Sequence, residues 1–92
     1  MIYTVYILFS AVHDKIYIGC TSDLIKRFHS HNSLGTKGWT IKYRPWTVVY
    51  AEYFKHKSEA FEREKILKTS KERKWIREKI VDTYPTMGFI SA

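Results

Sequence analysis

Two polar side chains share a helical face that would otherwise be apolar. The residues that follow the i, i+3, i+4, i+7 spacing of one helical face are Leu24, Arg27, Phe28 and His31. An arginine on such a face must find a partner or an anion, because an unpaired charge is costly to bury. Two interpretations follow for this face. Either Arg27 reaches past the edge of the core and His31 ends the helix, or both residues line an anion site.

An acidic side chain shares the inward face of a later helical stretch. The stripe with the same spacing consists of Ala60, Arg63, Glu64 and Leu67. Glu64 either pairs with Lys68 one turn further on, which is an ordinary stabilising contact, or contributes to a site. Polar residues on the inward faces of separate helices are most simply explained by a shared site. We therefore expect Glu64 to converge with Arg27 and His31.

The segment 32–44 interleaves cations with aromatic side chains and is predicted to be a loop. Such a combination suits a surface that contacts a phosphate backbone and stacks bases. The alternative is an ordinary connection whose Trp39 packs into the core. The candidate nucleic-acid contacts in this segment are Lys37, Trp39, Lys42, Tyr43 and Arg44. Cations further along the chain extend the set to Lys68, Lys71, Arg73, Lys74 and Arg77.

β-Branched and aromatic residues predict the strands that must position these side chains, at residues 2–9, 16–20 and 46–54. The first strand is apolar at nearly every position, so both of its faces should be covered and it should be central. The polar connection 10–14 has hairpin length, so the first two strands should pair antiparallel. In the second strand Tyr17 and Gly19 share one face, where the glycine leaves room for the close packing of a helix or for a ligand.

Capping residues predict where the helices begin. Ser22 or Asp23 should begin the first helix and Ser58 the second, where Glu59 and Glu62 would complement the helix dipole. A third helix should begin at the capping box Thr69-Ser70-Lys71-Glu72 and stop before Pro85. Its apolar side is formed by Trp75, Ile76 and Ile80.

These elements predict an α+β fold, a three-stranded antiparallel sheet flanked by helices in the order strand, strand, helix, strand, helix, helix. Residues 1–82 should form a single domain, and residues 83–92 a packed or frayed tail.

The charge balance favours a polyanionic partner. The 92 residues include 16 Lys and Arg against 9 Asp and Glu, a net charge of +7. Nucleic acid is the first expectation and an anionic membrane surface the second. Cys20 is the only cysteine, which excludes an internal disulfide and a cysteine-rich zinc site and suits a reduced, cytoplasmic setting. The apolar run 1–12 is too short to span a bilayer, so no membrane segment is expected.

Taken together, these residues resemble the GIY-YIG nuclease superfamily, particularly small stand-alone members related to the catalytic module of the bacterial excision nuclease. The positions that match in order, between about residues 3 and 68, are Val5-Tyr6-Ile7, Tyr17-Ile18-Gly19, Arg27, His31-Asn32 and Glu64. Two positions depart from the family, and the asparagine that some relatives use late in the fold has no counterpart here. Val5 replaces the glycine of the first triplet, and Cys20 stands where the excision nuclease carries a lysine.

The resemblance implies a phosphodiester hydrolase and a role for each matched residue. Hydrolysis needs an activated water, charge stabilisation at the phosphoryl oxygens and help for the leaving oxygen. Arg27 offers a planar fork for two phosphate oxygens, and Glu64 offers an oxygen ligand for Mg²⁺ or Mn²⁺. Tyr17 is the family's proposed general base, and His31 is a rival base or the acceptor of the phenolic proton. Tyr6 would orient the water or a phosphate oxygen.

We therefore expect a Mg²⁺-dependent endonuclease that makes single-strand breaks in nucleic acid, with DNA favoured over RNA, as in DNA repair, although the residues themselves do not distinguish the two. Its catalytic residues Tyr6, Tyr17, Arg27, His31 and Glu64 should share one concave surface. One alternative is a nucleic-acid-binding module that cleaves poorly, which the departure at Cys20 would explain. Another is a nucleotide-processing or interaction protein whose basic charge is only a solvated face. A protein partner or homodimerisation would supply specificity, because so short a chain has little surface for reading sequence.

Overall fold

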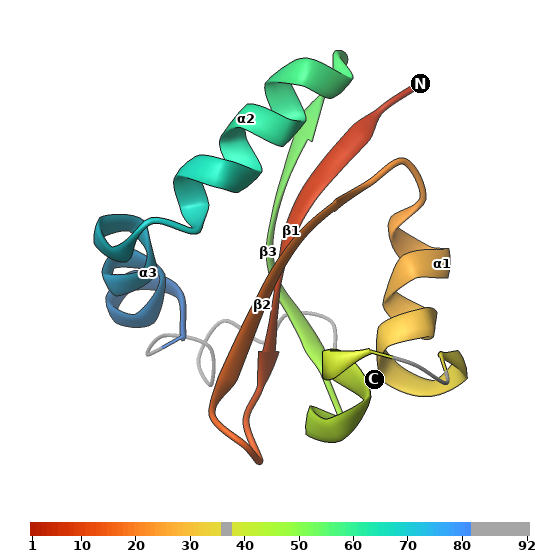
Figure 1. The fold of residues 1–92 in the computed structure, drawn as a ribbon, viewed down its shortest axis with the longest axis vertical. Helices are drawn as coiled ribbons and strands as arrows, with labels where there is room; N and C mark the ends of the chain where they lie inside the picture. The colour runs from red at the N-terminus through yellow and green to blue at the C-terminus, as the bar shows by residue number, and fades with distance from the viewer. Residues whose placement is uncertain (36–37, 82–92) are drawn as a thin grey trace.

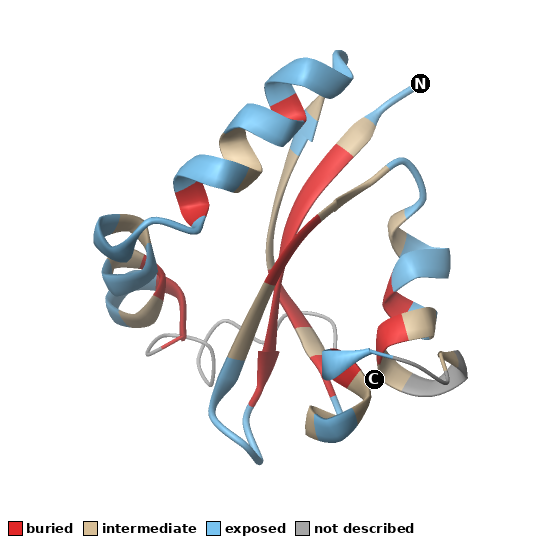
Figure 2. Cartoon of the chain, viewed as in Figure 1, coloured by how far each residue is buried: buried red, intermediate tan, exposed pale blue. Residues whose placement is uncertain are grey.

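A three-stranded antiparallel sheet forms the centre of the molecule. The computed structural model describes residues 1–35 and 38–81. The strands β1 (Tyr3–Ser10), β2 (Lys15–Thr21) and β3 (Thr47–Phe54) lie in the order β2-β1-β3, so the apolar first strand is central, as predicted. Most of β1 is buried, whereas the helices are largely exposed (Figure 2). A strand covered on both faces needs apolar residues at successive positions, which is the pattern that β1 has.

The helices form layers on opposite sides of this sheet (Figure 1). One side carries α1 (Leu24–His29), and the other carries α2 (Lys57–Leu67) and α3 (Ser70–Ile76). The fold class and element order are those expected from the sequence. Shorter helical turns follow at Ser30–Leu34, Trp39–Tyr43 and Arg77–Val81. The predicted loop 32–44 is therefore partly helical, because a 3₁₀ turn occupies Trp39–Tyr43.

Alternating side chains of β1 supply a separate core to each layer. Val5, Ile7 and Phe9 pack with Ala60 and Leu67 of α2, while Tyr6 and Leu8 pack on the other face with residues that include Phe28 and Trp46. Because neighbouring residues of a strand point to opposite faces, this alternation fixes the register of β1. The α1 layer is the one that receives the tyrosines of the matched triplets.

The predicted caps are correct for α1 and α3 but not for α2. The Asp23 side chain accepts a hydrogen bond of 3.1 Å from the backbone N–H of Lys26, and Thr69 is the N-cap of α3. The expectation that Ser58 caps α2 is wrong, since the helix begins one residue earlier, at Lys57. The carbonyl of His56 already accepts the first helical hydrogen bond, from Ala60 N at 3.2 Å.

Within the described part of the chain, the helices are too short or too polar to cross a lipid bilayer. Lys37 and the tail 83–92 lie outside the described residues.

Candidate active site

The close approach of β1 and β2 places the Tyr6 phenol over Gly19. These residues are opposite each other in the antiparallel register, and Tyr6 is fully buried. A Cβ atom at Gly19 would lie 2.5 Å from the Tyr6 hydroxyl oxygen. The space beside this glycine is therefore filled by the Tyr6 phenol of the neighbouring strand, and neither a closely packed helix nor a ligand site describes it. Any larger residue at this position would displace the phenol.

A hydrogen-bonded chain joins this phenol to the end of α1. The Tyr6 hydroxyl lies 2.9 Å from His31 Nε2, and His31 Nδ1 lies 3.0 Å from Thr40 Oγ1. His31 follows α1 within the turn Ser30–Leu34 and is only 5% exposed. Burial, and then the charges of Arg27 and Arg44, lower the pKa of His31 to about 4. The imidazole is therefore neutral near pH 7.

The protonation of Tyr6 fixes which nitrogen of His31 carries the hydrogen. Burial, followed by the Tyr17 phenol, raises the pKa of Tyr6, so its hydroxyl keeps its proton. That hydroxyl can then donate to His31 Nε2, which leaves the hydrogen on Nδ1 to be donated to Thr40 Oγ1. Both ring nitrogens of His31 are engaged in this arrangement. The geometry thus favours a positioning role for His31, which holds Tyr6 in place. It does not favour a role as the general base.

Arg27 and Tyr17 lie between the buried hydrogen-bonded residues and the protein surface. The Tyr17 ring packs against His31 at a centroid distance of 4.5 Å and against Tyr6 at 6.2 Å. Arg27 is exposed, and hydrogen bonding with the Tyr6 hydroxyl raises the pKa of Arg27. The arginine therefore stays charged while it faces solvent at the edge of the core.

A solvent-reachable hollow of about 140 Å³ lies among these groups. The residues that line it are Tyr17, Arg27, Ser30, His31, Gly38, Trp39 and Thr40. A guanidinium and a phenol at the wall of a small hollow suit a phosphate group. Arg27 is therefore exposed at the edge of the core, as the first interpretation expects, and it also lines the hollow, where an anion site stays a prediction.

Glu64 approaches from the opposite layer. Its side chain is 23% exposed, and the carboxylate accepts a hydrogen bond of 2.9 Å from Lys68 Nζ, the ordinary contact anticipated for it. Its negative charge also contributes, after burial, to the raised pKa of Tyr6 and of Cys20. Glu64 therefore lies near β2 and within electrostatic range of the Tyr6 hydroxyl, but it does not line the hollow beside Arg27.

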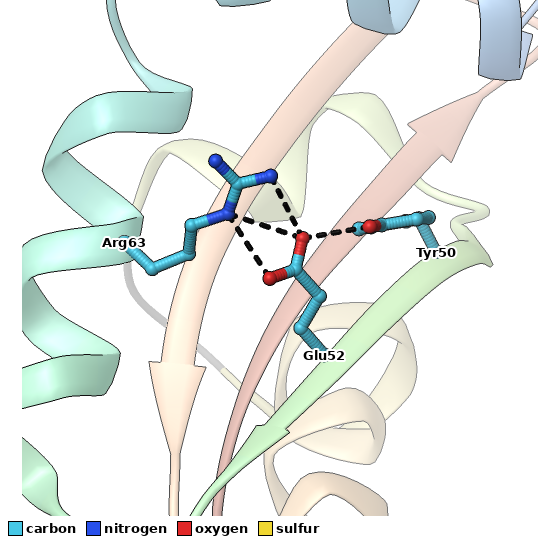
Figure 3. Close-up of polar contacts among 3 residues, drawn as sticks. All are labelled: Tyr50, Glu52 and Arg63. Carbon is cyan, nitrogen blue, oxygen red and sulfur yellow. Dashed lines mark hydrogen bonds and ion pairs between the residues drawn. The ribbon is translucent and has the colours of Figure 1, made fainter.

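An ion pair between Arg63 and Glu52 holds α2 against β3 (Figure 3). Arg63 donates to both carboxylate oxygens of Glu52 at 2.9 to 3.1 Å, and the Tyr50 hydroxyl donates to the same carboxylate at 2.7 Å. Burial alone would raise the pKa of Glu52, but the hydrogen bonds from Arg63 and Tyr50 hold it below its ordinary value. The arginine on the α2 stripe thus has a partner in the sheet, which helps to fix the position of Glu64.

Not all the candidate nucleic-acid contacts face solvent, because one of them, Arg44, binds carbonyl groups of the protein backbone. Trp39 and Lys42 are exposed, and Tyr43 is half-buried. Arg44 instead donates hydrogen bonds of 2.7 to 3.0 Å to the carbonyls of Ser30, His31 and Gly35. These bonds hold the turn that carries His31, so Arg44 stabilises the protein fold and is not a candidate for contacts with the nucleic-acid phosphates.

The Glu64 carboxylate supplies oxygen, the kind of donor that a hard divalent cation takes. Among the described residues, no group of three or more His, Cys, Asp and Glu side chains could enclose a metal. A single carboxylate such as Glu64 is enough for Mg²⁺ when water and phosphate oxygens complete the octahedron. The residues present therefore fit a magnesium ion that the substrate helps to hold.

Comparison with known proteins identifies the family. The model of the GIY-YIG catalytic domain matches residues 2–79. The chain belongs to the GIY-YIG catalytic domain family. This GIY-YIG domain also resembles the solution NMR structure of the UPF0213 protein BH0048 from Bacillus halodurans, with 26% identity over 83% of this chain and 82% of that one and a TM-score of 0.51. A comparison with curated proteins gave no match. Membership assigns the domain to a family of nucleases that act on nucleic acid.

Sequence reasoning about this GIY-YIG domain overlooked Thr40, whose hydroxyl binds His31 Nδ1. Asn32, one of the matched positions, has a structural contact that the sequence did not predict: its side chain accepts a hydrogen bond of 2.6 Å from the backbone N–H of Trp46. Thr40 lies in a segment predicted to be a loop, and no spacing rule links it to a helix that ends before it. The interleaving of cations with Trp39 was the only signal in this segment.

Proposed function

We propose that this GIY-YIG domain is a Mg²⁺-dependent endonuclease that makes single-strand breaks in DNA. The observation that carries the proposal is the hollow that has Arg27 and Tyr17 at its wall and the buried chain of Tyr6, His31 and Thr40 behind them. This arrangement combines a fixed positive charge with a phenol whose neighbours are held in place. Preorganised groups of this kind stabilise charge that develops on a phosphoryl group.

Each residue has a distinct role in the proposed reaction. Arg27 binds two oxygens of the scissile phosphate and stabilises their growing negative charge. Tyr17, which lines the hollow, acts as the base in its phenolate form: its own proton is first released to solvent, and the phenolate oxygen then takes a proton from the attacking water. Tyr6 and His31 keep the Tyr17 ring and the Arg27 guanidinium in position, and neither needs to change its protonation state.

Magnesium would be held by Glu64 together with water and the substrate phosphate. A bound Mg²⁺ would supply charge stabilisation at the phosphate and assist the leaving oxygen. Lys68 competes for the same carboxylate through its 2.9 Å contact, so Glu64 must exchange Lys68 for the cation. The phosphate that arrives with the substrate is a natural new partner for the Lys68 ammonium group.

A plasmid-nicking assay tests the proposal. Supercoiled plasmid incubated with the protein and Mg²⁺ should convert to the open circle, and EDTA should prevent the conversion. Arg27→Ala should lower the rate by about two or more orders of magnitude, because it removes charge stabilisation at the phosphate. Lys26→Ala is the matched control, since it removes a cation of the same helix that does not line the hollow with Tyr17 and His31. Equal rates for the two variants would contradict the role of Arg27.

The ion pair between Glu64 and Lys68 favours a second candidate, a domain that binds nucleic acid and cleaves it poorly. A carboxylate already neutralised by Lys68 at 2.9 Å is a weaker ligand for a cation. In that case the plasmid would be retarded in a gel by the protein but would stay supercoiled with Mg²⁺.

A further inference from the structure

The hollow beside Arg27 adjoins a second hollow that follows the edge strand β2. The two share Tyr17 and Trp39, and the second has a volume of about 420 Å³. The other residues that line it are Ile16, Ile18, Lys68 and Arg73. A concave surface, which we call the edge track, thus runs from Arg27 of α1 past Trp39 to the junction of α2 and α3. An extended strand of nucleic acid has the shape to follow such a track.

Trp39 stands in the middle of the edge track and is presented by a well-held turn. Its side chain is 44% exposed, although it packs against Tyr43 at a centroid distance of 4.6 Å and against Trp46 at 5.9 Å. Trp46 is fully buried, and its indole N–H donates to the Thr40 carbonyl at 2.8 Å. An aromatic ring that is held from behind and open to solvent is a preorganised surface for stacking.

Cations lie at both ends of the edge track. Arg27 is exposed at one end, and Lys68 and Arg73 are exposed at the other. The guanidinium of Arg73 donates from Nε to the carbonyl of Lys68 at 3.1 Å, which orients the group and uses one of its five N–H donors. Cations flanking an aromatic ring match the alternation of phosphate and base along a single strand.

We propose that the substrate carries an unpaired nucleotide whose base stacks on Trp39, while the flanking phosphates contact Arg27 on one side and Lys68 and Arg73 on the other. The inference rests on the proposed nuclease function and specifies its substrate class. A base can reach Trp39 only by leaving its own stack, which costs least where it is unpaired, mismatched or single-stranded. Bulges, flaps and single strands therefore suit the edge track better than uninterrupted duplex.

Metal-free binding tests this substrate class without requiring catalysis. Two DNA duplexes of matched length are compared in EDTA, one fully paired and one with a single bulged 2-aminopurine. The bulged duplex should bind about tenfold more tightly, a difference of about 1.4 kcal/mol, because one base stacks on the indole. The 2-aminopurine fluorescence should be quenched on binding, as expected for a base stacked on an indole.

Variants at Trp39 test whether the preference for the bulged duplex depends on this side chain. Trp39→Ala should lose about tenfold in affinity for the bulged duplex and little for the paired one, whereas Trp39→Phe should keep most of the preference. Trp75→Phe is the control, since Trp75 packs against Tyr50 and does not line the edge track. Circular dichroism checks the folding of each variant.

Equal affinity of the unmodified protein for the two duplexes, or unquenched 2-aminopurine, would overturn the inference even if Trp39→Ala fails to fold. Cleavage of both duplexes at one rate in Mg²⁺ would likewise refute the substrate class while leaving the nuclease function standing. A bulge preference without any cleavage would refute the nuclease function and keep the stacking site.

Discussion

At the scale of single residues, His31 shows how a group suited to proton transfer can be made structural. Its ring nitrogens contact Tyr6 and Thr40, and the side chain is almost fully buried. Removing a hydrogen-bonded imidazole from water favours its neutral form, which is why its pKa falls to about 4. His31 and Tyr17 both line the hollow, but Tyr17 is only partly buried and therefore has the better access to an attacking water.

The lowered pKa of His31 makes stability depend on pH in a defined window. An unfolded chain binds a proton at histidine near pH 6.5, whereas the folded protein binds it only near pH 4. Stability is therefore fully present above about pH 6.5 and falls as the pH drops toward 4, by roughly 3 kcal/mol. Urea unfolding at several pH values should show this loss, and His31→Gln should reduce it. The exposed His56→Gln should leave the loss unchanged, and an equal pH slope for both variants would contradict the assignment.

Substitution of Glu64 separates a metal ligand from a scaffold residue. Glu64→Gln should lower the nicking rate by about two or more orders of magnitude, because the charge that holds the cation is gone. The affinity for DNA in the absence of metal should stay level or rise slightly, since a negative charge near the bound phosphates has been removed. The melting temperature should change little, because a partly exposed i, i+4 pair contributes only about 0.5 kcal/mol.

The exposed Glu62→Gln, on the same helix, is the matched control. A large drop in melting temperature with retained nicking would instead identify Glu64 as a structural partner of Lys68.

At the scale of secondary-structure elements, the sequence predicted what local rules determine and missed what tertiary contacts determine. The burial of β1 follows from its continuous apolar run, and the caps at Asp23 and Thr69 follow from side-chain chemistry. The turn that carries His31 could not be predicted in the same way. It depends on Arg44, which reaches back across more than ten residues to bind its carbonyls. No periodicity records a contact of that kind.

The ion pair between Arg63 of α2 and Glu52 of β3 is expected to contribute cooperatively to the free energy of unfolding. Arg63→Gln or Glu52→Gln alone should each destabilise the protein by about 1 to 3 kcal/mol, because each leaves a partly buried charge with fewer hydrogen bonds. The double variant should cost less than the sum, with a coupling of about 1 kcal/mol or more. Unfolding free energies of the four proteins measure this coupling. Additive costs would mean that the contact drawn in Figure 3 does not stabilise α2.

At the scale of the whole molecule, the sequence predicted the α+β architecture. It did not predict that the site residues would be divided between the α1 layer and the α2 layer. Tyr6 and Tyr17 lie in the α1 layer, whereas Glu64 belongs to the α2 layer on the other side of the sheet. The stripe containing Glu64 was correctly identified as inward-facing. Which face of the sheet it would meet depends on the path of the chain after β3, and residue spacing does not encode that path.

The net charge of +7 should make binding to nucleic acid steeply dependent on salt. If about four phosphates are neutralised, log K should fall with log salt at a slope of roughly −3 to −4. The double substitution Lys68→Gln and Arg73→Gln should reduce that slope by about 2. Lys65→Gln, an exposed cation of α2 outside the edge track, should change it little. A flat titration would indicate a protein partner instead.

The close approach of Tyr6 to Gly19 also links the assembly of the site to strand pairing. A slip of one residue between the strands would set a side chain where the phenol now passes and would turn the facing residues toward the opposite layer. Misregistered molecules would therefore lose the site and the core together, with no well-packed but inactive species between them. Counting the molecules in a preparation that bind substrate would then also count those whose strands have paired correctly.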